Sequence, residues 1–172
     1  RAAARVVESY PNTYFFIAGI GGARENKYRV VLERLIESLK LTDRVRLVGW
    51  LEDIAQLYCA LDVFVSASHT ESFGLAIAEA MASSTAVVAT ETAGAREIIR
   101  SGETGLLAPL DDVEKLSEAI LLLLKQKERR TSMGAAGQRA VSAQFSLSRM
   151  IDETEKIYTD VLNKQEINRD DY

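Results

Sequence analysis

Short runs of β-branched and aromatic residues alternate along this chain with longer segments in which apolar residues recur every three to four positions. This alternation predicts β-α units, in which helices cover both faces of a parallel sheet. Each short run is almost continuously apolar, as expected for a strand that is buried on both faces. Five strands are predicted, at residues 13–18, 44–48, 63–66, 86–89 and 105–108.

Apolar stripes at helical spacing predict the helices that connect and follow these strands. Val31, Leu35 and Leu39 belong to a stripe that predicts a helix over residues 25–39, with this stripe lying on the sheet. Further segments of helical period are residues 53–60, 111–124, 130–144 and 146–162. Charged residues interrupt the pattern at residues 125–130, and the chain starts in a segment that is typical of the middle of a helix.

Two acidic residues mark the expected starts of two of these helices. Asp53 is followed three positions later by Gln56, and Asp111 by Glu114. In a capping box, residues at this spacing satisfy the exposed amide groups of the first turn reciprocally. We therefore expect Asp53 and Asp111 to cap their helices.

Length and composition fit one soluble domain. The chain has 172 residues, of which 47% are hydrophobic, and a formal net charge of −4 with interspersed signs, which argues against a nucleic-acid partner. Cys59 stands among apolar residues, so we expect a core residue in a reducing compartment, with no disulfide framework and no metal site. Without a signal region or a run of ~20 apolar residues, we expect a cytoplasmic protein, peripheral at a membrane in its full-length form. The start at Arg1 suggests a fragment.

In an open parallel sheet, ligands bind beyond the carboxyl ends of the strands. After the first predicted strand, Gly19 and Gly21 let the backbone approach a ligand, although such glycines also serve simply to reverse the chain. After the second strand, Gly49, Trp50 and Leu51 suit a nucleobase lying over main-chain atoms. The alternative, which the residues favour for the side chain itself, is that Trp50 packs over the edge of the sheet and that the local backbone contacts the ligand.

The segment after the third strand carries the sharpest signal. A helix beginning near Phe73 would present free amide groups and the positive end of its dipole to a diphosphate, and Gly74 removes the side chain at the closest approach. His69 precedes this helix and is either a polar contact for a sugar or a loop residue without chemistry.

Two glutamates flank this helix start. Glu71 lies before the helix and Glu79 inside it, and a carboxylate binds neighbouring hydroxyls of the kind that a sugar ring or a ribose offers. The alternative makes Glu71 a helix-start carboxylate and Glu79 a surface residue. The apolar neighbours of Glu79 argue against this alternative, because they predict a helix that is apolar almost all round.

The segment from Glu71 to Glu79 resembles the donor-binding signature of the family 4 retaining glycosyltransferases. It has two glutamates eight positions apart, with Ser-Phe-Gly after the first and Ala-Met after the second. Other segments agree with the family in order and spacing. They are residues 17–21, 45–51, 60–66, 87–90 with Gly94 and Glu97, and 102–109.

The resemblance implies the C-terminal half of a GT-B enzyme, a Rossmann-like three-layer α/β/α domain over residues 1–172 that binds a nucleotide diphosphate sugar. The full-length enzyme would transfer a hexose to an acceptor sugar or lipid held by an N-terminal domain, without a required cofactor or metal. By the same resemblance, Glu71 positions the donor sugar, Glu79 binds the ribose diol, and Gly49 and Leu51 border the base. The remaining donor contacts in this reading are Gly19, Gly21, Trp50, His69, Ser72, Phe73, Gly74, Leu75 and Ala76.

The chain also departs from the family pattern. The family's first strand of this domain, with its glycine, arginine and lysine, has no counterpart, and neither does the acceptor domain. Ser84, Ala86 and Ala93 stand where the family usually has glycine, proline and glycine. We therefore expect weak binding of a nucleotide sugar and no transfer by this chain alone. Family members pack their last helix on the other domain, so we expect residues 146–164 to expose an apolar face and to self-associate.

Two other functions are compatible with the same patterns. A nucleotide-sugar epimerase or a phosphorylase would use a related second domain. A non-catalytic doubly wound module for protein contacts would leave Glu71 and Glu79 with structural roles only.

Overall fold

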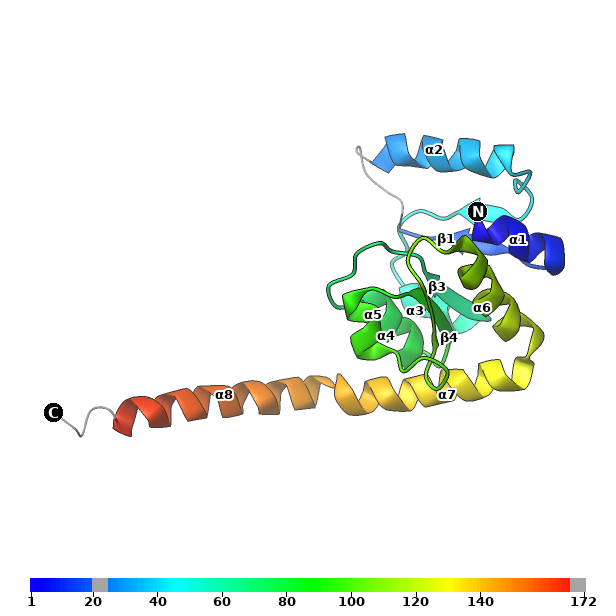
Figure 1. Cartoon of the computed structure of the whole chain (residues 1–172). Helices are drawn as coiled ribbons and strands as arrows, with labels where there is room; N and C mark the ends of the chain where they lie inside the picture. The colour runs from blue at the N-terminus through cyan, green and yellow to red at the C-terminus, as the bar shows by residue number, and fades with distance from the viewer. Residues whose placement is uncertain (20–24, 168–172) are drawn as a thin grey trace.

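A computed structural model of the chain describes residues 1–19 and 25–167 (Figure 1). The strands are β1 Phe15–Ile17, β2 Val45–Leu47, β3 Val63–Ser66, β4 Ala86–Thr90 and β5 Leu106–Ala108. The helices are α1 Ala2–Ser9, α2 Glu25–Ser38, α3 Ile54–Ala60, α4 Leu75–Ala82, α5 Ala93–Ile98, α6 Val113–Lys125, α7 Lys127–Gln144 and α8 Leu147–Ile167. The α/β class is confirmed, and every predicted strand is present.

The strands pair in parallel, in two groups rather than in one continuous ladder. β1 pairs with β2, with Phe15 opposite Val45, and β4 lies between β3 and β5. A doubly wound sheet has the strand order 3-2-1-4-5-6. The two observed groups correspond to its two flanks, so the central position between β1 and β3 is not filled by any strand of the described residues.

The core lies on both faces of β4, all five residues of which are buried. Side chains alternate between the faces of a strand, so Val87 and Ala89 pack in one cluster with α3, α4 and α5. Ala86 and Val88 pack in a second cluster with α1 and α6. The helices of these two clusters form the outer layers of the predicted three-layer arrangement (Figure 1).

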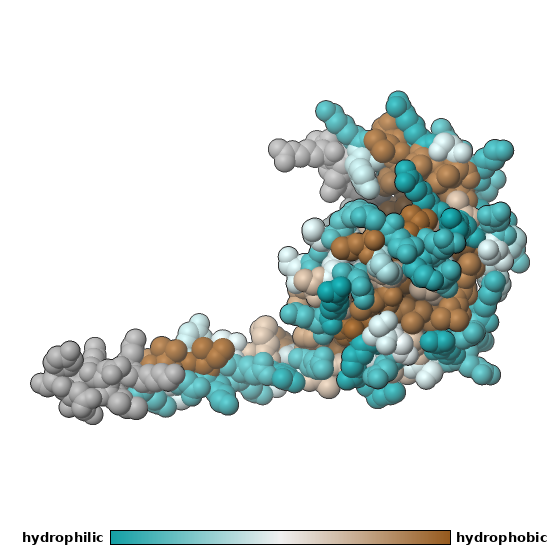
Figure 2. Space-filling model, viewed as in Figure 1, coloured by the Kyte–Doolittle hydropathy of each residue, from teal (hydrophilic) through white to brown (hydrophobic). Residues whose placement is uncertain are grey.

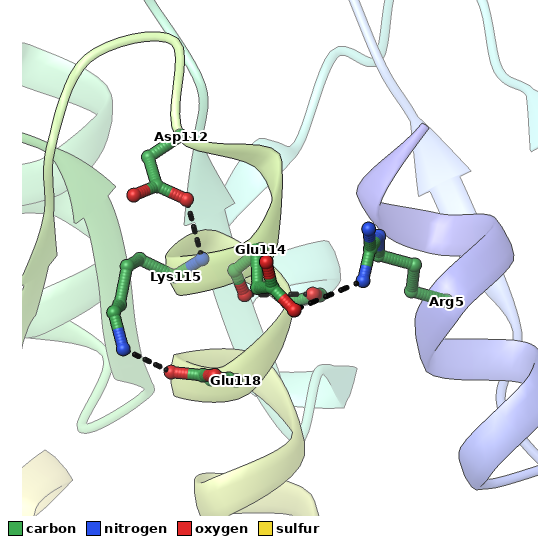
Figure 3. A network of polar contacts seen from close by, with 6 residues as sticks. Arg5, Asp112, Glu114, Lys115 and Glu118 are labelled. Carbon is green, nitrogen blue, oxygen red and sulfur yellow. Dashed lines mark hydrogen bonds and ion pairs between the residues drawn. The ribbon is translucent and has the colours of Figure 1, made fainter.

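One of the two predicted caps is correct, and the other lies one residue further along. Asp53 caps α3, because its carboxylate accepts from the Gln56 backbone N–H at 3.3 Å, although the Gln56 side chain bonds the Asp53 carboxylate instead of a backbone amide. Asp112, and not Asp111, caps α6 by accepting from the Lys115 N–H at 2.8 Å (Figure 3). Asp111 has a φ of 61°, a left-handed turn conformation, and therefore lies before the cap.

Helix α1 packs on α6 through apolar contacts. Val6 is fully buried against the cluster that holds Leu116 and Ile120. The ion pair between Arg5 and Glu114, 3.4 Å apart, joins the same helices at the surface (Figure 3). Exposed pairs of this kind contribute little, ~0–1 kcal/mol, so packing holds α1 in place.

Cys59 is exposed on α3, and the prediction of a core residue is wrong. The adjacent Tyr58 takes the buried position instead. Both residues have apolar neighbours in the sequence, and only the orientation of this seven-residue helix separates the two. Helix α5, whose N-cap is Thr92, was not predicted from the sequence.

Helix α8 projects away from the rest of the chain, and apolar side chains lie on its surface (Figures 1 and 2). The exposed apolar residues are Leu147, Met150, Ile151, Ile157, Tyr158, Val161 and Leu162. The expected exposed face is therefore present, whereas self-association stays a prediction that light scattering at several concentrations would test. Within the described residues, none of the helices combines the length and the apolar character that a membrane span requires.

Candidate functional site

The loops that follow β1 and β2 lie side by side. The Gly19 N–H donates to the Gly49 carbonyl at 3.3 Å, and Gly19 has a φ of 88° that favours glycine. Two of the predicted donor-binding segments are thus joined directly. Gly21 lies outside the described residues.

Trp50 stands in the second of these loops with 83% of its surface exposed. The alternative in which its side chain packs over the edge of the sheet is therefore wrong. Gly49 and Leu51 beside it are half-buried. An exposed indole next to accessible main chain leaves room for a flat ligand, so a base at this loop stays a prediction.

Helix α4 begins at Leu75, after Gly74 at the N-cap with φ 101° and ψ 47°. The start lies two residues after Phe73, because the left-handed conformation of Gly74 is not helical. No side chain caps α4, whereas Asp53, Thr92 and Asp112 cap α3, α5 and α6. The first-turn amides of a helix lack intrahelical partners, so those of α4 are available to an anion.

Helix α5 supports the loop that leads into α4. The Gly94 N–H donates to the Glu71 carbonyl at 3.0 Å. A Cβ atom at Gly94 would lie only 2.5 Å from the Phe73 carbonyl oxygen, so the two backbones are in direct contact. Gly94 belongs to the family pattern, but its contact with the loop before α4 was not predicted from the sequence.

Two further contacts hold the same loop. The Thr90 hydroxyl, at the end of β4, donates to the Ser68 carbonyl at 2.6 Å. The Phe73 ring meets the Phe145 ring edge-on, with centroids 5.3 Å apart. Hydrogen bonds and packing thus fix the backbone around residues 68–74 before any ligand binds.

Glu71 lies where the sequence predicts it, beside the start of α4. It is half-buried, and a Cβ atom at Gly74 would lie 3.6 Å from its Cγ atom. Its side chain therefore lies next to the helix start. A role in binding sugar hydroxyls fits this position and stays a prediction.

Glu79 is exposed, so the argument from its apolar neighbours against a surface position is wrong. Leu75, with 67% of its surface exposed, and Ala76 lie on the same open side of α4. Helix α4 buries one face only, because its other side has no covering element in the described residues. Glu79 is nevertheless held, since its Oε2 accepts a hydrogen bond from the Tyr58 hydroxyl at 3.0 Å.

Tyr58 is the titratable group most clearly affected by this arrangement. The pKa of Tyr58 is raised to about 12, first by burial and then by the hydrogen bond to Glu79 and the negative charge of Glu79. The phenol therefore remains a hydrogen-bond donor at neutral pH.

His69 and Ser72 lie at the exposed rim of this region. The His69 Nδ1 atom is 3.5 Å from an Asp111 carboxylate oxygen, and both side chains are largely exposed. This contact connects the loop after β3 with the turn before α6. Ser72 is exposed in the loop before α4.

The combination has a definite chemical character. Free amides at the start of α4 suit an anion, and the carboxylates of Glu71 before that helix and Glu79 within it suit hydroxyl groups. Within residues 1–19 and 25–167, the structure holds no group of three or more side chains suited to a metal ion. A cavity of about 440 Å³, lined in part by Cys59, Asp62 and Arg130, lies at the other end of the sheet, where β4 begins.

Comparisons with known proteins agree with this character. Residues 1–140 match the family described as glycosyl transferases group 1. The N-acetyl-alpha-D-glucosaminyl L-malate synthase of Bacillus anthracis is 33% identical over 129 residues, which cover 75% of this chain and 34% of that protein. The lipopolysaccharide core biosynthesis glycosyltransferase LpsE of Rhizobium meliloti is 33% identical over 146 residues, which cover 85% of this chain and 42% of that protein.

A solved structure agrees with the fold. Sucrose-phosphate synthase from Thermosynechococcus elongatus is similar with a TM-score of 0.86 and 28% sequence identity, over 95% of this chain and 42% of that one. The chain thus spans well under half the length of these relatives.

Proposed function

This chain belongs to the glycosyl transferases group 1 family, and from that premise we propose that it is the donor-binding domain of a retaining, family 4 enzyme that transfers a hexose from a nucleotide diphosphate sugar. The observation that carries the proposal is the uncapped start of α4 at Gly74, with Glu71 beside it and Glu79 further along the helix. The diphosphate would bind at the amides, the sugar near Glu71 and the ribose near Glu79.

In this proposal Glu71 positions the donor and does not attack it. Retention of the anomeric configuration then follows from attack on the face that the leaving phosphate vacates. Glu71 binds hydroxyls of the sugar, and the helix amides stabilise charge that develops on the leaving diphosphate. The site would need no metal or other cofactor, because main-chain donors neutralise part of the phosphate charge.

The acceptor, a sugar or a lipid, would bind to a part of the full-length protein outside residues 1–172. The relatives are more than twice as long as the segment that they share with this chain, which leaves room for such a domain. Transfer by residues 1–172 alone is not expected.

We also propose that the full-length protein supplies the central strand between β1 and β3. The split of five parallel strands into two groups supports this proposal, as does the exposed Phe16 on β1. In a longer protein that contains the strand, backbone amides of β1 and β3 should exchange with solvent at least tenfold more slowly than in residues 1–172. Equal exchange in the two forms would contradict the proposal.

Replacement of Glu79 tests the donor site. Glu79→Ala should weaken binding of a nucleoside diphosphate roughly tenfold or more, because hydrogen bonds to a charged group contribute about 1.5–3 kcal/mol. Isothermal titration calorimetry with UDP, GDP and ADP would measure the loss. Glu155→Ala, which removes an exposed glutamate of α8, is the matched control. Equal affinity of the Glu79 variant and the unaltered chain would instead favour a protein-contact module.

A further inference from the structure

Tyr58 is buried and is fixed in place by contacts with two other parts of the chain. Only 5% of its surface is exposed. Its ring meets the Phe64 ring of β3 edge-on, with centroids 5.5 Å apart. Its backbone carbonyl accepts a hydrogen bond from the buried Thr85 hydroxyl at 2.7 Å. The phenol oxygen therefore has a defined position relative to β3 and β4.

This fixed phenol donates to a carboxylate that is otherwise exposed. The Tyr58 hydroxyl lies 3.0 Å from Glu79 Oε2, and the two residues come from different helices, α3 and α4. An exposed glutamate side chain normally samples several rotamers, and restricting it costs about 1–2 kcal/mol of conformational entropy. The hydrogen bond from Tyr58 already restricts the Glu79 side chain. Ligand binding therefore loses less conformational entropy at Glu79.

We propose that Tyr58 is a positioning residue for the donor site: its hydroxyl holds Glu79 Oε2, so that Oε1 and the remaining lone pair of Oε2 face the two neighbouring hydroxyls of a ribose. This inference rests on the proposed function and adds a residue that does not itself touch the ligand. A carboxylate has acceptor positions for about four hydrogen bonds, so one bond from Tyr58 leaves enough for a diol.

A purely structural role for the same hydrogen bond makes a different prediction. If the hydrogen bond only gave the Tyr58 hydroxyl a partner, its loss would change the free energy of unfolding. The relative affinity for ribose and dideoxyribose ligands would stay the same. If Tyr58 positions Glu79, loss of the hydrogen bond lowers the affinity for ligands with a ribose diol and leaves the affinity for ligands without one unchanged. The comparison of ribose and dideoxyribose ligands therefore separates the two roles.

The test is calorimetric titration of residues 1–172 with UDP, GDP or ADP and with the matching 2′,3′-dideoxynucleoside diphosphate. Tyr58→Phe keeps the ring packing and removes the hydroxyl. It should weaken binding of the ribose form roughly three- to tenfold and leave the dideoxy form unchanged. In a Glu79→Ala background, Tyr58→Phe should have no further effect. Tyr158→Phe on the projecting α8 is the matched control.

A second variant covers the case in which Tyr58→Phe does not fold. Thr85→Val keeps both Tyr58 and Glu79 and removes the hydrogen bond that fixes the Tyr58 backbone. A smaller loss of affinity, again confined to the ribose form, is expected.

An equal loss, or no loss, with both ligand forms would overturn the role of Tyr58 and leave the proposed function intact. Failure of the unaltered chain to bind any of the three diphosphates, or full affinity of Glu79→Ala, would overturn the proposed function and this inference together.

Discussion

Replacing Gly94 with alanine is expected to abolish measurable nucleotide binding and to lower the free energy of unfolding by about 1–3 kcal/mol. The added Cβ atom would lie 2.5 Å from the Phe73 carbonyl oxygen and 2.9 Å from the Phe73 Cα atom. Both are backbone atoms, so no flexible side chain can move to relieve the overlap. The loop from Glu71 to Gly74 has to shift, and the amides at the start of α4 shift with it.

Calorimetry and chemical denaturation of the same preparation separate these two effects. Ala93→Ser is the matched control, because it adds one side-chain atom at the exposed position next to Gly94. Unchanged affinity in a folded Gly94→Ala variant would show that the position of this loop does not control binding.

Replacing Gly134 with alanine is expected to destabilise the chain by up to about 3 kcal/mol. Replacing a glycine in a helix interior with alanine normally raises the free energy of unfolding by about 1 kcal/mol. A lower free energy of unfolding would therefore indicate a steric overlap at Gly134. Here the new Cβ atom would overlap the Ser84 carbonyl oxygen, where α7 packs against the turn before β4. A full side chain would therefore push α7 off the sheet.

The midpoint of chemical denaturation measures this loss. Ser132→Ala, on the exposed side of α7, should leave the midpoint within about 0.5 kcal/mol of the unaltered chain. A rise in stability with Gly134→Ala would mean that α7 does not pack as closely on the turn as the structure has it.

The predicted strands were found because each is a short run rich in apolar residues, a local property of the sequence, although β4 alone is buried throughout among these strands and β1 exposes Phe16. The order of the strands is not local, and neither is the division into two groups. Asp111 and Asp112 are chemically equivalent candidates for a cap, and the choice of Asp112 depends on the left-handed turn at Asp111. Short helices such as α5 have too few residues for a clear apolar stripe.

The sequence predicted a candidate site at the start of α4, because Glu71, Gly74 and Glu79 follow a strand in one short pattern. The exposure of Glu79 and its hydrogen bond to Tyr58 were not predicted from the sequence. The apolar neighbours of Glu79 predicted burial, but α4 packs on the core with one face and leaves Glu79 exposed. Tyr58 and Gly94 contribute through contacts with residues 21 positions apart and more, and no local pattern encodes such contacts.

The central claim is that a nucleoside diphosphate binds at the first-turn amides of α4. The most direct measurement is an NMR titration of isotope-labelled chain with UDP, GDP and ADP. The account predicts that the backbone amide signals of Gly74, Leu75 and Ala76 move most and saturate with one of these ligands. Signals that move instead around Arg130, at the cavity where β4 begins, or that do not move with any of the three, would contradict it.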